Sequence, residues 1–176
     1  MSNPTPLIVD LDHTLIDTDL LYQSSIRSLK RNPLLILIYP FWFVQGKGYL
    51  KDQLIKHCEI DVSELPYIEK TINYINERKQ QGSPVILATA SHQYYAHQVA
   101  KHLGIFDDVM ASDADFNLSS HNKAKKLVER FGHKGFDYMG DHMRDLPVWE
   151  ASNLSILVNV NQRVINKAQH LETLVL

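Results

Sequence analysis

Short apolar runs that end in polar residues recur along the chain, and they predict buried strands of a parallel sheet. The clearest runs are Leu7–Val9, Val85–Ala88 and Ser155–Val158, and weaker examples are Asp108–Met110 and Phe136–Met139. Stretches of helical periodicity separate the later runs. Residues 92–103 and 122–131 each end at a glycine typical of a helix C-terminus, and Pro147 suits the first turn of a further helix. This alternation predicts an α/β fold with a right-handed parallel sheet.

The stretch between Leu15 and Ser83 breaks the alternation, because it contains no convincing strand. Its patterns predict helices over 19–31, 49–57 and 66–81, with Asn32 and Pro33 as an N-cap and first-turn proline between the first two. We therefore expect a core domain formed by residues 1–16 and 82–176. Residues 17–81 are expected to form a helical cap insertion that includes a return helix.

Composition limits the class of protein. The chain has 176 residues and a formal net charge of -2, which argues against nucleic-acid binding, and its 44% hydrophobic content argues against disorder. Cys58 is the one cysteine in the sequence, so neither an internal disulfide nor a cysteine zinc cluster is expected; it is expected to be a buried or partly buried thiol. Because residues 1–6 do not resemble a signal peptide, a soluble protein of the reducing cytoplasm is expected.

Leu34–Val44 is uncharged and, apart from Pro40, entirely apolar or aromatic. As a helix it would extend about 16 Å, too short for a hydrocarbon core of roughly 30 Å. One interpretation is internal packing of the cap. The other is an exposed face that contacts a membrane, a membrane protein or another partner, or an apolar substrate chain, with Trp42 at the interface and Lys47 and Lys51 following it.

Polar residues follow several of the predicted strands at the edge where parallel sheets bind ligands. Asp10 and Asp12 follow the first strand, Thr89 ends the second, and Asp141 and Asp145 follow the fourth. A lysine, Lys123, precedes that fourth strand; Lys125 and Lys126 are competing assignments for it. Carboxylates this close repel one another, and a divalent cation relieves the repulsion, so the pattern predicts a Mg²⁺ site.

The same residues suggest a reaction. Asp10 can attack phosphorus to form an aspartyl-phosphate, while Asp12 protonates the leaving oxygen and then activates water. Thr89, Ala90 and Lys123 are expected to bind the phosphoryl oxygens. The predicted metal ligands are Asp10, Asp141 and the backbone carbonyl of Asp12, supported by Asp145. His13, Thr14 and His142 flank these residues and are candidate substrate contacts.

Taken in order, Asp10-x-Asp12-x-Thr14, Thr89, Lys123 and Gly140-Asp141-x-x-x-Asp145 resemble the four motifs of the haloacid dehalogenase-like (HAD) hydrolases. The resemblance implies a Rossmann-like sheet of order 5-4-1-2-3 with a cap inserted after the first strand. In that superfamily an aspartate at the second acidic position accompanies phosphate-ester chemistry, so Asp12 implies a phosphatase.

A finer resemblance is to the HAD domain fused to UbiA-type prenyltransferases. It is carried by Asp12-x-Thr14-Leu15, the uncharged segment after Asn32-Pro33, Leu87-Ala88-Thr89-Ala90 and the stretch 136–149. It implies a phosphatase that works near polyprenyl-phosphate or phosphoribosyl chemistry, on a small or lipid-linked phosphorylated metabolite. His13 stands where the family often has glycine, and Ser119-Ser120 stand where it often has Lys-Gly. The alternatives are a phosphate-binding or accessory module of a membrane prenyltransferase system, and a phosphomutase.

Overall fold

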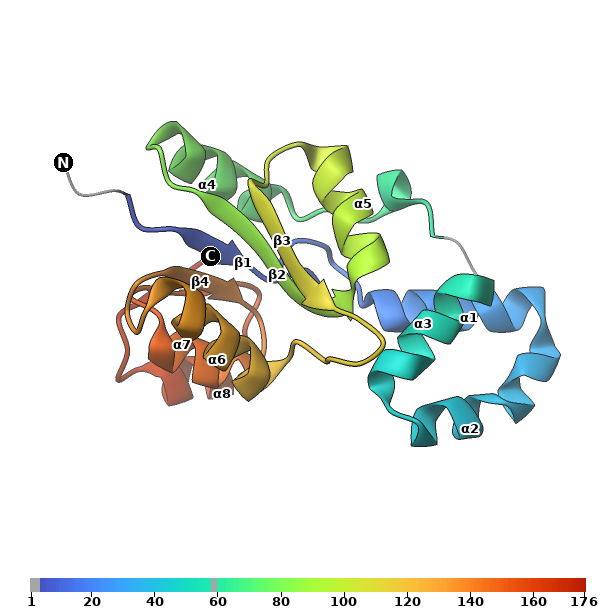
Figure 1. Cartoon of the computed structure of the whole chain (residues 1–176). Coiled ribbons are helices and arrows are strands. Elements are labelled where there is room, and N and C mark those ends of the chain that lie inside the picture. Colours follow the sequence, from blue (N-terminus) through green and yellow to red (C-terminus); the bar gives the residue numbers. More distant parts are fainter. Residues whose placement is uncertain (1–3, 58–59) are drawn as a thin grey trace.

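The computed structural model describes residues 4–57 and 60–176, without the side chain of Lys47. Cys58 and the first three residues lie outside the described part. Six strands form one parallel sheet in the order β3-β2-β1-β4-β5-β6 (Figure 1). The strands are β1 (Leu7–Val9), β2 (Val85–His92), β3 (Asp108–Ser112), β4 (Asp137–Gly140), β5 (Ser155–Leu157) and β6 (Thr173–Val175). The predicted order of five strands is confirmed, with β6 as an additional edge strand.

Helices cover both faces of this sheet (Figure 1). On one side lie α4 (Glu69–Gln80) and α5 (Gln93–Leu103); on the other lie α6 (Ser120–Phe131), α7 (Leu146–Ala151) and α8 (Gln162–Ala168). The alternation of β1 explains the two layers, because Leu7 and Val9 pack with the first helices and Ile8 packs with the second set. All three β1 residues are fully buried.

Several element boundaries differ from the sequence prediction. Strand β2 continues to His92, whose ring nitrogen accepts a hydrogen bond from the Tyr94 amide and so caps α5. The helix expected from Pro66 begins at Glu69. The helix start expected at Asn32 and Pro33 is the short 3₁₀ helix η1 (Pro33–Leu37). Two further 3₁₀ helices, η2 (Val62–Glu64) and η3 (Met143–Asp145), were not indicated by the periodicity. The last of these places Asp145, which the candidate site uses.

The inserted helices are α1 (Leu20–Arg31), α2 (Tyr39–Val44) and α3 (Lys47–His57), joined through η1. Together they form the cap, which lies beside the carboxyl ends of β1 and β2 (Figure 1). The chain enters and leaves the insertion at adjacent positions: Asp17 donates to the Pro66 carbonyl at 2.8 Å, and Ile68 donates to the Leu15 carbonyl at 2.9 Å. The return helix α4 packs on the sheet rather than on the cap, because its Ile75 belongs to the core cluster.

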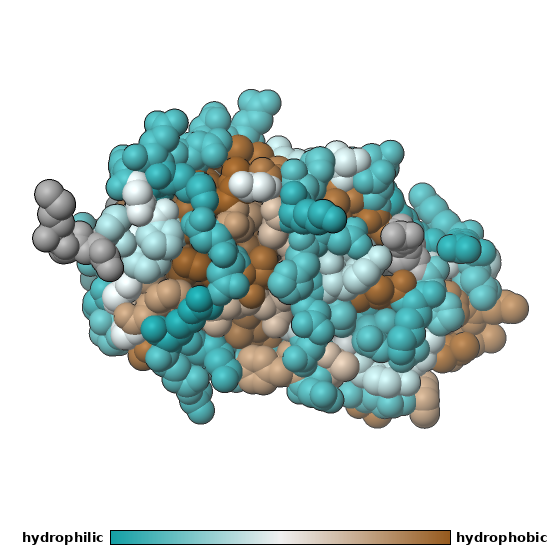
Figure 2. Space-filling view, turned by 45° about the horizontal axis from the view of Figure 1, so that its top comes forward, coloured by the Kyte–Doolittle hydropathy of each residue, from teal (hydrophilic) through white to brown (hydrophobic). Residues whose placement is uncertain are grey.

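The apolar segment Leu34–Val44 divides between a core and a surface. Leu35 and Trp42 are buried in a small cap cluster with Leu50 and Leu54. Tyr39 is half-buried against this cluster. The other large apolar side chains of the segment face solvent, and hydrophobic residues reach the surface at this end of the molecule (Figure 2, right). No helix in residues 4–57 and 60–176 is long and apolar enough to cross a membrane.

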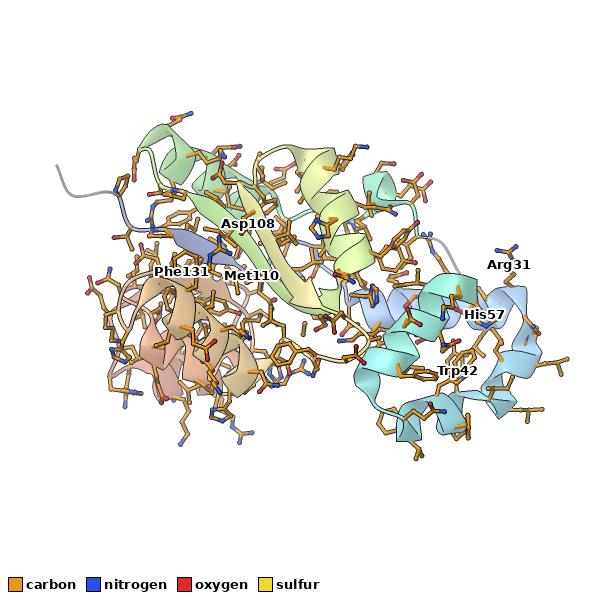
Figure 3. The ribbon with its side chains drawn as sticks, in the orientation of Figure 1. Arg31, Trp42, His57, Asp108, Met110 and Phe131 are labelled. Atoms are coloured by element: carbon orange, nitrogen blue, oxygen red, sulfur yellow. The ribbon has the colours of Figure 1, made fainter. Side chains whose placement is uncertain are left out.

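The interface interpretation places Trp42 and Lys51 at an exposed surface, but both side chains are buried. The Trp42 ring stacks on His57 with centroids 5.3 Å apart and packs on Tyr39 at 5.5 Å, inside the cap (Figure 3). Lys51 is buried and points toward the core domain, where it donates to the Ala90 carbonyl. Neither residue is part of the exposed apolar surface.

Candidate active site

Asp10 lies directly after β1, where its amide still pairs with the Met139 carbonyl at 3.0 Å. Its carboxylate accepts a hydrogen bond from the Lys123 ammonium at 2.8 Å. Burial raises the pKa of Asp10 above its ordinary value; the Lys123 charge opposes this rise and the Asp145 charge adds to it. The pair therefore joins a strand end of the sheet to the first turn of α6.

Lys123 is the α6 lysine that reaches the strand ends. Its side chain is 2% exposed and donates to both Asp10 and the Tyr138 hydroxyl, each at 2.8 Å. Lys125 and Lys126 lie at the surface of the same helix and approach Glu129. The structure thus brings Lys123 to the site and leaves the two competing lysines outside it.

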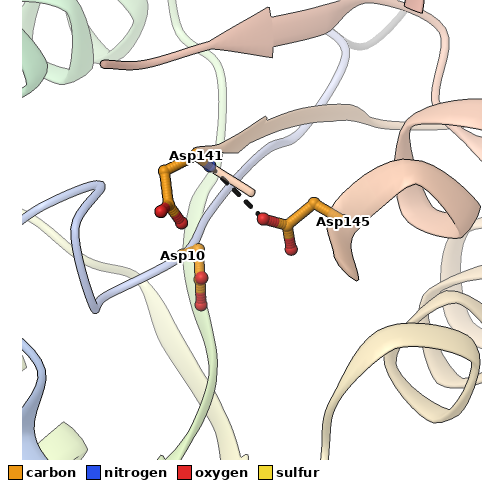
Figure 4. Close-up of side chains that lie close together, drawn as sticks. All are labelled: Asp10, Asp141 and Asp145. Carbon is orange, nitrogen blue, oxygen red and sulfur yellow. Dashed lines mark hydrogen bonds between the residues drawn. The ribbon is translucent and has the colours of Figure 1, made fainter. Parts of the chain in front are cut away.

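Asp10, Asp141 and Asp145 form an acidic cluster in which one oxygen of each carboxylate lies within 4.8 Å of the others (Figure 4). Asp145 is fixed by three donors: the Tyr138 hydroxyl at 2.8 Å, the His142 amide at 3.1 Å and the Asp141 amide at 3.3 Å. Tyr138 thus connects Lys123 with Asp145, and a continuous chain of hydrogen bonds runs from Asp10 to Asp145.

Gly140 makes room for this cluster. A Cβ atom at position 140 would lie 2.8 Å from the Asp145 carboxylate and 2.9 Å from the Tyr138 ring. Both groups are buried and hydrogen-bonded, so neither can withdraw without breaking the connection to Lys123. The glycine of Gly140-Asp141-x-x-x-Asp145 therefore serves close packing, since its backbone does not adopt a positive φ angle.

The cluster fits a hard divalent cation by its donor set and by its electrostatics. Burial, followed by the charges of Asp10 and Asp145, raises the pKa of Asp141 to about 7. Three carboxylates gathered in this way offer only oxygen ligands, the type that Mg²⁺ and Ca²⁺ prefer, and a cation there would remove their mutual repulsion. Asp10, Asp141 and Asp145 are the side chains that could hold it.

Asp12 lies beside the cluster but turns its carboxylate elsewhere. One oxygen accepts from the Leu20 amide at 2.9 Å, at the start of the cap, and the other accepts from the Ser91 hydroxyl at 2.6 Å. Burial, with the charge of Asp19 next, raises the pKa of Asp12 to about 7. A carboxyl group with such a pKa can both give and take a proton near neutral pH.

The candidate residues surround a cavity of about 360 Å³ between the cap and the strand ends. Its lining includes residues expected from the sequence, namely Asp10, Asp12, His13, Ala90, Lys123, Asp141, His142 and Asp145. Thr89 does not line it: this side chain is fully buried, and its hydroxyl accepts from the Ser91 amide at 2.9 Å. Thr14 is also buried, with its hydroxyl 3.4 Å from Asp141. Ala90 and Ser91 form this part of the wall.

Sequence reasoning missed several residues of the site. Lys51 reaches the cavity from α3, donating to the Ala90 carbonyl and, at 3.2 Å, to the Asn117 side chain. Ser91 binds Asp12, and Tyr138 links the lysine to the cluster. A polar contact of Tyr138 could have been predicted, because a tyrosine in an otherwise apolar buried strand needs a partner for its hydroxyl. The position of Lys51 in the cavity could not be predicted from the sequence, because it depends on how the cap helices pack beside the core domain.

Comparison with known proteins agrees with this architecture. The family model for haloacid dehalogenase-like hydrolases matches residues 7–150. An uncharacterized protein, y4nM, of Sinorhizobium fredii (strain NBRC 101917 / NGR234) is 38% identical over 154 residues, which are 87% of this chain and 30% of that protein. The chain thus spans about a third of this relative's length.

Two solved structures share the fold at low sequence identity. A predicted phosphatase from Clostridium acetobutylicum superposes with a TM-score of 0.71 at 17% identity, covering 99% of this chain and 94% of its own. A phospho-aspartyl intermediate analogue of phosphoserine phosphatase superposes with a TM-score of 0.64 at 13% identity, covering 94% and 91%. The family model spans the acidic cluster, Asp12 and Lys123, and the chain belongs to the haloacid dehalogenase-like hydrolases.

Proposed function

We propose that the protein is a Mg²⁺-dependent phosphomonoester hydrolase that acts through an aspartyl-phosphate on Asp10. The observation that carries the proposal is the pairing of two different carboxyl groups. Asp10 is bound by Lys123 beside the acidic cluster, whereas Asp12 is held by Ser91 and Leu20 with a pKa of about 7. Such a difference in environment suits a nucleophile and a separate acid–base group.

In the first half-reaction, an Asp10 oxygen forms a bond to phosphorus while the bond from phosphorus to the ester oxygen breaks. Asp12 gives its proton to the departing oxygen, so the alcohol leaves neutral. Lys123 stabilises the negative charge on Asp10 and on the transferring phosphoryl group. Ala90 and Ser91, which line the cavity, would bind the phosphoryl oxygens. The buried hydroxyl of Thr89 would support this wall through its hydrogen bond with the Ser91 amide.

In the second half-reaction, Asp12 takes a proton from water as the water oxygen bonds to phosphorus. The bond between Asp10 and phosphorus then breaks, and inorganic phosphate leaves. Asp10, Asp141 and Asp145 would hold Mg²⁺, with the Asp12 carbonyl as a further proposed ligand; the ion supplies charge neutralisation for the phosphoryl group. The positive charge of a bound cation would also favour the ionised carboxylate of Asp10, which the first step needs.

The substrate that we propose is a small or lipid-linked phosphate ester. The cavity of about 360 Å³ suits a small head group, and the exposed apolar residues of the cap lie on the same insertion as Lys51. The finer resemblance to the HAD domain of UbiA-type prenyltransferases favours a lipid-linked member of this class. The single cysteine is consistent with a reducing cytoplasmic setting.

Hydrolysis of p-nitrophenyl phosphate tests the proposal. The wild-type protein should release phosphate with Mg²⁺ and lose activity in EDTA, and Asp10→Asn should lower kcat at least about 10³-fold because the amide cannot attack phosphorus. Lys125→Gln is the matched control, because it removes a charge from α6 outside the site. Full activity of Asp10→Asn would exclude the covalent route. Isomerisation of a sugar phosphate without phosphate release would instead favour a phosphomutase.

A further inference from the structure

We propose that the cap docks on an anionic lipid surface through an apolar tip formed by exposed side chains of η1 and α2. Seven of the eleven exposed large hydrophobic side chains of the described chain lie within this short segment. They are Leu34, Ile36, Leu37, Ile38, Phe41, Phe43 and Val44. Single exposed hydrophobic residues are ordinary on a protein surface, but a contiguous group of this kind marks an interaction site.

The tip is presented by a folded scaffold. Leu35 and Trp42 point into the cap cluster and Tyr39 packs against it, and these three side chains hold the exposed residues of the segment outward. Val44 is 84% exposed and Leu37 is 76% exposed, while Trp42 is only 6% exposed. The cap is the part of the molecule farthest from β5 and β6, and α2 lies at its outer side (Figure 1). A protruding apolar face can enter an interface without disturbing the sheet.

The charge of the cap identifies the partner. Residues 20–57, which form the cap, contain six lysine or arginine residues and one acidic residue, Asp52, although the whole chain carries a net charge of -2. Among these cations, Lys51 points toward the core domain and Arg27 lies 3.8 Å from Glu64. Lys30 and Arg31 are exposed at the end of α1, immediately before the apolar segment, and Arg31 extends outward there (Figure 3). Apolar and aromatic side chains flanked by cations match the boundary of an anionic bilayer, which takes up the former and attracts the latter.

A second copy of the chain fits this face less well. A symmetric contact would place the tip of one protomer against the same tip of the other and would bring Lys30 and Arg31 of both copies together. The acidic residue of the cap, Asp52, already pairs with Lys56 at 2.8 Å. A lipid surface carries the opposite sign of charge and needs no complementary shape. The charge distribution therefore favours the membrane over self-association.

Vesicle flotation of the wild-type chain tests the proposal independently of catalysis. The protein should float with vesicles that contain phosphatidylglycerol, bind vesicles of phosphatidylcholine alone at least about tenfold more weakly, and lose part of its binding at high salt. A wild-type protein that binds neither type of vesicle overturns the proposal.

Matched variants separate the tip from the rest of the surface. Phe41→Ser combined with Phe43→Ser should reduce binding at least about tenfold, whereas Tyr94→Ser combined with Val175→Ser, at exposed positions elsewhere, should leave it unchanged. Lys30→Gln with Arg31→Gln should weaken binding to anionic vesicles about tenfold or more, and Arg163→Gln with Lys167→Gln on α8 should not.

Circular dichroism and hydrolysis of p-nitrophenyl phosphate check that the tip variants are folded, since Phe41 and Phe43 do not line the cavity. Undiminished flotation of the Phe41/Phe43 variant would contradict the proposal. So would a wild-type dimer, seen by light scattering, that fails to bind vesicles and becomes a monomer in the Phe41/Phe43 variant; that result would assign the tip to a second copy.

Discussion

His13 and Ser120 adopt backbone conformations that glycine enters more readily, with φ angles of 57° and 48°. Both stand where the related motifs often carry glycine. The chain thus keeps the glycine-type backbone at the two positions without the glycine. For a residue with a Cβ atom, this left-handed region costs roughly 1–2 kcal/mol. Both side chains border the cavity, so the two departures from the family pattern change its wall.

Ser120→Gly should raise the free energy of unfolding by about 0.5–1 kcal/mol, because it relieves the left-handed strain. Ser119→Gly is the matched control: Ser119 has a φ angle of -130°, so glycine there gains nothing and adds freedom to the unfolded chain. Urea unfolding of the two variants measures the difference. Equal stability changes in both would mean that the Ser120 backbone is not strained.

Lys51 provides a second residue-scale test. Lys51→Met should raise KM for a phosphate ester about tenfold, because it removes a cation from the cavity wall together with the contacts to Ala90 and Asn117. Lys56→Met, on the same helix, removes a lysine whose partner is Asp52 at the surface, and should leave KM unchanged. Steady-state kinetics distinguish the two. An unaltered KM in Lys51→Met would remove Lys51 from substrate binding.

At the scale of elements, an ion pair fastens the return helix α4 to the sheet. Arg78 lies 2.8 Å from Asp137 at the start of β4, and both side chains are nearly buried. Arg78 also donates to the Thr5 carbonyl, before β1, and Asp137 accepts from Asn153 and Leu154, before β5. One pair thus ties three neighbouring strands to the helix that closes the insertion.

Arg78→Met should destabilise the fold by about 2–4 kcal/mol, because it leaves the Asp137 carboxylate buried without its cation. The neighbouring Lys79→Met removes a more exposed pair with Asp107 and should cost less than about 1 kcal/mol. Thermal unfolding of both variants provides the comparison. Similar losses for the two would contradict the special role of the buried pair.

The elements that the sequence predicts well are those with a strong local signal. The helix caps at Asn32 and Gly104 occur as expected, because a short polar side chain or a glycine satisfies the helix end locally. Asp19, expected as the first helical residue, is instead the N-cap of α1. Strand β6 escaped prediction, since Thr173–Val175 is three residues long and largely exposed, and only its pairing with β5 makes it a strand. The sequence left Trp42 open between cap packing and an interface for a similar reason: its burial involves His57, from another helix.

For the site, the motifs predicted which residues gather at the strand ends but not how they are oriented. Asp10, Lys123 and Asp141 meet as the pattern indicates. The carboxylate of Asp12 accepts a hydrogen bond from the Ser91 hydroxyl, and the Thr89 hydroxyl accepts one from the Ser91 amide. Both donor groups of Ser91 lie where the register between β2 and β3 shifts, between Thr89 and His92, and no residue pattern in the sequence predicts this shift.

At the scale of the whole molecule, the buried carboxyl groups of the site, Asp12 and the acidic cluster, lower the stability of the fold when no cation is bound. The pKa values of Asp12 and Asp141 rise from 3.8 to about 7 in the folded protein. Between about pH 4 and pH 7 the folded state therefore binds more protons than the unfolded state, so stability falls as the pH rises through this window. The burial and mutual repulsion of the site carboxylates destabilise the folded protein, and a bound divalent cation would reduce both effects.

The metal-free protein should therefore have a lower Tm at pH 7.5 than at pH 5.5, and Mg²⁺ should raise Tm more at the higher pH, where its ligands are ionised. Asp141→Asn should stabilise the metal-free protein at pH 7.5 by roughly 1–2 kcal/mol, and it should reduce the Mg²⁺ effect. The pH dependence should become weaker but persist, because Asp12 keeps its raised pKa. Scanning calorimetry measures all three. A Tm of the metal-free wild type that rises over this pH range would contradict the account.

The insertion of the cap has a consequence for how the molecule can diversify. The chain leaves the sheet after Leu15 and returns at Pro66 and Ile68, and hydrogen bonds join the two crossings side by side. The isolated bridge between Ile16 and Tyr67 closes the same junction. Whatever lies between these residues can lengthen, shorten or be exchanged without altering the spacing of the strands. Changes in the cap can therefore alter one wall of the cavity while the sheet keeps its geometry, except at Leu20 and Lys51, where the cap holds Asp12 and Ala90.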